Sequence, residues 1–177
     1  MAFRFRSIYT LLFAVNIFSF AHSTYSSELN ISIKIPELNV AEYHNPYVAI
    51  WIENQDDKSV TDVQVWYNAK MRDKEGNKWL KDLRQWWRKS GRSLDMPVDA
   101  ITAATKGPGK YNLNFIADDK KLKNLTPGNY RLRIEAAREV GGRELLDIPF
   151  QWPIKNAATA KAQGESELGE VILSLKP

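Results

Sequence analysis

Two hydroxyl groups and one carboxylate lie close together in the middle of the chain, in a stretch of otherwise small side chains. Asp99 is followed by Thr102 and Thr105, and two alanines separate the threonines. A run this small can enter the active site of another enzyme, and a hydroxyl is what the formation of a phosphoester requires. The stretch is therefore a candidate for covalent modification by a partner enzyme. The alternative is an ordinary surface turn in which Asp99 caps a short helical turn through Thr102.

The spacing resembles the acceptor motif of bacterial flavin transferases: Asp, two variable residues, Ser or Thr, Gly or Ala, Ala, then Ser or Thr. These transferases act outside the cytoplasm, where they cleave FAD and place FMN on the last hydroxyl through a phosphoester. The resemblance implies that FMN is attached to Thr105 and that Asp99, Thr102, Ala103 and Ala104 complete the motif. Asp99 would orient the loop or bind the transferase. Ala103 stands where the best-known acceptors usually have Gly.

Aromatic and basic side chains near this motif are candidates for holding an attached flavin. The flat, electron-poor isoalloxazine ring stacks on exposed Trp or Tyr, and Trp86 and Trp87 lie just upstream. Neighbouring residues of a helix point about 100° apart, so we expect one of this pair in the core, together with Trp79, and the other at its edge. Arg88 and Lys106 are the expected partners of the FMN phosphate.

These tryptophans belong to a segment with helical spacing of its apolar side chains, which predicts one helix over residues 78–89. Residues 93–110 follow without a core pattern, and long loops of this kind tend to be functional. Seven other segments alternate like β-strands: residues 29–35, 47–53, 60–67, 111–116, 130–136, 144–152 and 170–175. They predict an all-β fold, an immunoglobulin-like or fibronectin-like β-sandwich with one inserted helix. At one corner we expect the Tyr130 hydroxyl to return to the backbone.

The beginning of the chain is typical of a secretory signal peptide. Arg4 and Arg6 precede an almost wholly apolar run over residues 8–20, and small residues follow. We predict cleavage after Ser23 and a periplasmic protein whose mature form has no transmembrane segment. An uncleaved anchor is the alternative, disfavoured because no basic stop-transfer cluster follows. The predicted boundaries are residues 1–23 for the signal peptide, 24–28 for a linker and 29–177 for a single domain.

The composition excludes several classes of site. The chain has no cysteine, so disulfides and thiolate metal ligands are impossible. Removing residues 1–23 takes away two arginines and lowers the net charge from +4 to +2, and no long basic block favours nucleic acid. His44 is then the single remaining histidine, which argues against a multi-histidine metal site or a catalytic triad. No nucleophile and base pair for a stand-alone hydrolase is visible.

Longer phrases, over residues 44–54, 78–88 and 134–139, resemble a family of predicted periplasmic proteins catalogued as a domain of unknown function. That family is often encoded beside flavin transferases and PepSY-type membrane proteins that look like reductases. The resemblance implies a flavin-carrying electron-transfer protein, itself a substrate of the transferase and not a stand-alone enzyme. The alternative function is a non-redox sandwich module that binds a ligand or a protein through its helix and loop.

Overall fold

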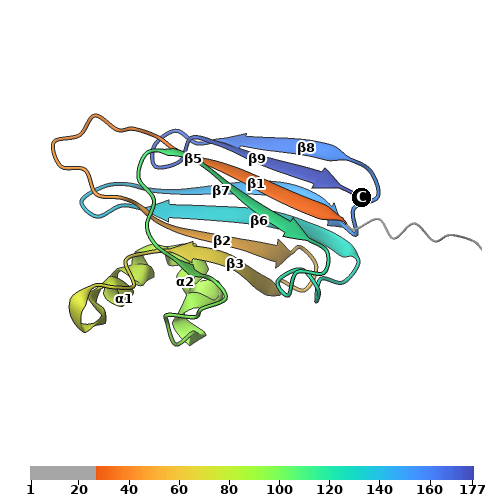
Figure 1. Cartoon of the computed structure of the whole chain (residues 1–177), viewed down its shortest axis with the longest axis horizontal. Helices are drawn as coiled ribbons and strands as arrows, with labels where there is room; N and C mark the ends of the chain where they lie inside the picture. The colour runs from red at the N-terminus through yellow and green to blue at the C-terminus, as the bar shows by residue number, and fades with distance from the viewer. Residues whose placement is uncertain (1–26) are drawn as a thin grey trace, which may run out of the picture.

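The computed structural model describes residues 27–177 (Figure 1). The predicted signal peptide and its cleavage site lie outside the described residues. Within the described part, no helix is long and apolar enough to cross a membrane.

Two sheets, antiparallel except where β4 joins the edge of one, form a β-sandwich, as the strand pattern predicts (Figure 1). One sheet has the order β5-β1-β9-β8, and the other has the order β4-β3-β2-β6-β7. The strands of the first sheet are β1 (Glu28–Ile35), β5 (Gly109–Ile116), β8 (Ala158–Gln163) and β9 (Glu170–Lys176). Those of the second are β2 (Tyr47–Asn54), β3 (Val60–Trp66), β4 (Thr102–Ala103), β6 (Gly128–Ala137) and β7 (Arg143–Trp152).

The core between the sheets is built from the alternate residues of each strand. In β1, Leu29, Ile31 and Ile33 are buried, and the residues between them are only partly covered. The central strand β2 is buried along almost its whole length, because both of its faces are covered. Its Ile50 faces the sandwich core, whereas Trp51 belongs to a second apolar cluster on the outer side.

All seven predicted strands are present, and the structure adds two that the sequence pattern did not indicate. β4 is two residues long and pairs in parallel with β3. β8 is an edge strand whose side chains are small or polar. Because most of them are exposed, its sequence shows no alternation of apolar and polar residues. The expected corner is confirmed, because the Tyr130 hydroxyl donates a hydrogen bond of 2.7 Å to the carbonyl of Thr126.

The predicted helical insertion covers the outer face of the five-stranded sheet (Figure 1). It is not one continuous helix. The segment consists of η1 (Arg72–Lys74), α1 (Glu75–Trp79), η2 (Leu80–Asp82), α2 (Arg84–Lys89) and η3 (Gly91–Ser93). The α-helical path breaks at Leu83, with φ −74° and ψ 68°. At the start of the second helix, the Glu135 carboxylate on β6 accepts hydrogen bonds from the backbone N–H groups of Gln85 and Trp86, which have no partner within the helix.

The break lets the segments before and after it place apolar side chains on the sheet. Leu80, Leu83 and Trp86 are fully buried against Trp51 and Val65 in the second cluster. The insertion is therefore a third layer of the fold, with a core of its own.

Candidate functional site

The first part of the acceptor-like motif is fixed to the sheet. The backbone N–H of Val65 donates to the carbonyl of Ile101 at 2.7 Å, and that of Tyr67 donates to the carbonyl of Ala103 at 2.9 Å. These bonds enclose the two residues of β4. The expected long loop is thus interrupted by a strand, and the chain is free of this pairing only after Ala103.

A turn closed by a threonine precedes the strand. The backbone N–H of Val98 donates to Oγ1 of Thr102 at 3.0 Å, and the N–H of Thr102 donates back to the carbonyl of Val98 at 2.9 Å. Asp99 lies at the exposed tip of this turn, and among the described residues its carboxylate accepts no hydrogen bond. The turn is therefore held by Thr102 and not by capping from Asp99.

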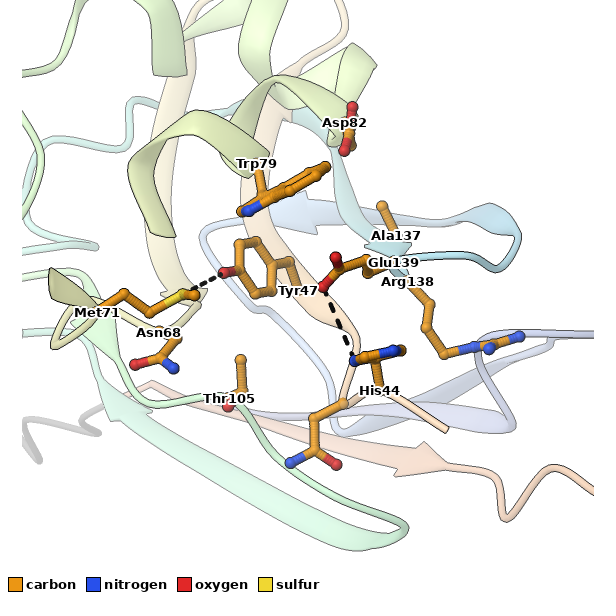
Figure 2. A pocket seen from close by; sticks show the side chains of 11 residues that line it. His44, Tyr47, Asn68, Met71, Trp79, Asp82, Thr105, Ala137, Arg138 and Glu139 are labelled. Atoms are coloured by element: carbon orange, nitrogen blue, oxygen red, sulfur yellow. Dashed lines mark hydrogen bonds and ion pairs between the residues drawn. The ribbon is translucent and has the colours of Figure 1, made fainter. Parts of the chain in front are cut away.

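Thr105, two residues beyond β4, lines a cavity of about 250 Å³ (Figure 2). The cavity lies where the β1–β2 connection, the chain after β3, the helical layer and the end of β6 meet. Its other lining residues are His44, Asn45, Tyr47, Asn68, Met71, Trp79, Asp82, Ala137, Arg138 and Glu139. Segments far apart in the sequence thus form one site around the candidate hydroxyl.

Two aromatic side chains, those of Trp79 and Tyr47, form part of a wall that is otherwise mostly polar. In Figure 2, Trp79 of α1 lies next to Tyr47, while Thr105 and His44 lie on the side of the cavity away from Trp79. The Tyr47 hydroxyl contacts the Met71 sulfur at 3.9 Å. Burial raises the pKa of Tyr47, so its ring is uncharged at neutral pH.

Two polar side chains at the cavity, those of His44 and Arg138, lie close to carboxylates. Nε2 of His44 lies 2.9 Å from Glu42, and its Nδ1 lies 3.8 Å from Glu139. The Arg138 guanidinium points away from Thr105 (Figure 2) and forms a buried bidentate pair with Glu167, at 2.9 and 3.1 Å.

The cation beside the candidate hydroxyl in sequence is Lys106. Its ammonium lies 5.6 Å from the centre of the Tyr111 ring. The Tyr111 hydroxyl in turn donates to the carbonyl of Gly107 at 2.9 Å, which fixes the chain on the far side of Thr105.

The other candidates of the sequence analysis lie away from this cavity. Trp86 is fully buried and donates its indole N–H to Asp62 at 2.7 Å. Trp87 is half-buried at the edge of the second cluster, as expected for one of the pair. Arg88 is exposed on α2, and neither Trp87 nor Arg88 lines the cavity. Trp79, which we expected in the core, is the tryptophan that lines it.

Sequence reasoning did not place His44, Tyr47 or Trp79 at the site. A signal was present, because two of the three phrases that carry the family resemblance contain these residues. Spacing along the chain does not show that these phrases meet at Thr105.

A family model described as "Predicted periplasmic protein (DUF2271)" matches residues 28–170. This description confirms the predicted periplasmic location and the resemblance to a domain of unknown function. No curated protein and no solved structure matches the chain.

Proposed function

The chain belongs to this family of predicted periplasmic proteins, and from that premise we propose that it is a flavoprotein that carries FMN covalently on Thr105. It would exchange electrons with a membrane reductase, for which a PepSY-type protein is the proposed partner. A flavin transferase would modify it. In this proposal the protein is the substrate of the transferase and is not itself a catalyst.

The observation that carries the proposal is the position of Thr105, which places the last hydroxyl of the motif at a cavity that Trp79 and Tyr47 also line. In the transfer reaction, a phosphoester bond forms between Oγ1 of Thr105 and the FMN phosphate of FAD. The pyrophosphate bond of FAD breaks, AMP leaves, and the threonine hydroxyl loses its proton. The transferase would catalyse this step.

The chain around Thr105 suits such a reaction. β4 ends at Ala103, so Ala104 and Thr105 are outside the strand pairing. Ala104 is exposed, and Thr105 is partly exposed. An active site of another enzyme can therefore reach the hydroxyl without breaking the sheet.

The lining of the cavity fits a flavin in its chemistry. Trp79 and Tyr47 offer aromatic faces or edges for the isoalloxazine ring. Lys106 does not line the cavity, but it is a cation next to the attachment residue in the sequence and could pair with an attached phosphate. With about 250 Å³, the cavity is smaller than the usual ligand pocket, so part of the cofactor would remain exposed to a redox partner. Bound FMN would supply the ability to accept and donate electrons.

The direct test is co-expression with a flavin transferase, followed by intact mass and in-gel fluorescence. We expect the wild type to gain the mass of FMN less one water, Thr105→Ala to gain nothing, and Thr105→Ser to be modified. Thr159→Ala is the matched control: it removes an exposed threonine hydroxyl outside the motif, and we expect it to be modified like the wild type. If the mass of the wild type did not change under conditions that modify a known acceptor, the proposal would be contradicted. If Thr105→Ala were still modified, the attachment residue would be another one.

The second candidate function is a non-redox module that binds a small polar ligand. The polar side chains of His44, Glu139 and Asp82 that line the cavity favour it. The same experiment separates the two functions, because this alternative requires no modification of Thr105.

A further inference from the structure

The helical layer carries most of the excess positive charge of the protein. Residues 70–92, which we call the basic layer, contain nine basic and three acidic side chains. The basic residues are Lys70, Arg72, Lys74, Lys78, Lys81, Arg84, Arg88, Lys89 and Arg92, and all nine are exposed. The described residues outside the layer hold 14 basic and 18 acidic side chains, so the two parts of the molecule have opposite net charge.

Little of this positive charge is neutralised within the fold. Of the nine cations, Lys89 forms an ion pair, at 3.1 Å from Glu53, and the other eight form none among the described residues. The layer packs on the sheet through its apolar side, so these charges lie on its solvent side. A charged partner would meet them directly.

The surface chemistry of the layer distinguishes between kinds of partner. Specific protein interfaces have a partly apolar centre and are depleted of Lys. In the described part of the chain, the strongly exposed large apolar side chains are Val40, Ile116 and Val140, and none belongs to the basic layer. A surface of five lysines and four arginines without a strongly exposed apolar centre matches a negative charge that is spread over a wide area, such as that of phospholipid headgroups.

We propose that the basic layer docks the protein on an anionic phospholipid bilayer. The acidic remainder is repelled by the same surface, so the charge asymmetry orients the molecule with its helices toward the lipid. Trp79 and Asp82 belong to the layer and line the cavity. Docking therefore holds the cavity close to the membrane. This inference does not depend on the flavin, and it is tested on unmodified protein.

The experiment is co-sedimentation with large vesicles of phosphatidylcholine alone or with added phosphatidylglycerol. We expect binding to the anionic vesicles only, and its loss at about 1 M salt, where the screening length is about 3 Å. The triple charge reversal Lys70→Glu, Lys78→Glu and Lys81→Glu should weaken binding at least about tenfold, because it replaces three cations that the surface attracts with three anions that it repels.

The matched control reverses three exposed lysines outside the layer, Lys110→Glu, Lys120→Glu and Lys123→Glu, which changes the net charge equally. We expect this variant to keep most of the binding, and urea unfolding checks that both variants are folded. If both variants weakened vesicle binding equally, the proposed orientation of the basic layer toward the lipid would be overturned, because net charge alone would explain the binding. Binding to pure phosphatidylcholine, or no binding to the anionic vesicles at low salt, would overturn the proposal itself.

Discussion

Oε2 of Glu135 accepts a hydrogen bond of 2.9 Å from the backbone N–H of Trp86, at the first turn of α2. The same carboxylate accepts from the N–H of Gln85 and from the Arg143 guanidinium, both at 2.9 Å. Glu135 is fully buried on β6. A negative charge at a helix start satisfies N–H groups that have no partner within the helix. This contact joins the helical layer to the sheet.

We predict that Glu135→Ala lowers the free energy of unfolding by about 2 to 4 kcal/mol, because it leaves buried N–H donors without an acceptor. Urea unfolding measures this loss. Glu170→Ala is the control, since it removes an exposed ion pair with Lys161 and should cost at most about 1 kcal/mol. If the two variants had the same free energy of unfolding, the hydrogen bonds of Glu135 would not be what holds the helical layer on the sheet.

Trp79, and not Trp87, should contact an attached flavin. If FMN occupies the cavity, Trp79 quenches its fluorescence by stacking, so Trp79→Leu should raise the emission of modified protein. Trp87→Leu should leave it unchanged, because Trp87 lies outside the cavity. The yield of modification, read by intact mass, normalises the signal. If Trp87→Leu raised the flavin emission and Trp79→Leu did not, the isoalloxazine ring would instead lie against α2.

The free energy of unfolding should fall as the pH drops below the usual pKa of a carboxyl group. Burial alone would raise the pKa of Glu53, but hydrogen bonds from Arg133 and Lys89 outweigh it and hold that pKa below 4.5. The pKa of Glu144 is also lowered, because backbone N–H bonds, including that of Leu168, outweigh its burial. Such groups stabilise the fold above their unfolded-state pKa, and the contribution is lost as the pH falls through the folded-state pKa.

The urea midpoint, measured from neutral pH downward, should therefore decline below about 4.5. Glu144→Gln keeps a hydrogen-bond acceptor but does not titrate, so its midpoint should depend less steeply on pH. A profile of Glu144→Gln as steep as that of the wild type would show that this carboxylate does not contribute.

Gly91→Ala should destabilise the helical layer. A Cβ at this position would lie 2.6 Å from a carbon of the Trp86 ring, which is fully buried and cannot move away without repacking its neighbours. Overpacking of this kind costs about 1 to 3 kcal/mol. Gly128→Ala is the comparison, because its nearest neighbour atom would be at 3.7 Å, an ordinary contact. Thermal or urea unfolding of both variants gives the difference.

The sandwich could be predicted because its strands carry the signals that burial leaves in a sequence. β1 and β6 alternate, and the Tyr130 corner follows a Pro-Gly turn. β4 and β8 could not be predicted in the same way. Two residues are too few for a period, and the side chains of β8 are small or polar and mostly exposed.

The helix was predicted as continuous because its apolar spacing is helical on both sides of Leu83. The interruption depends on Glu135, which is far away in the sequence and reaches Trp86 only in the folded sheet. The cavity likewise depends on contacts between segments that are far apart in the sequence. Tyr47 and Trp79 each carry an unremarkable local pattern, and tertiary packing brings them to Thr105.

The pairing of β4 with β3 limits how far a group attached to Thr105 could move. The last paired residue is Ala103, and two residues of extended chain span about 7 Å at most. The hydroxyl of Tyr111 holds the chain at Gly107 on the other side. An attached cofactor would therefore stay where the sheet puts it, unlike one on a swinging arm. Donor and acceptor would have to visit the protein in turn, and the frequency of those encounters would set the rate of electron flow.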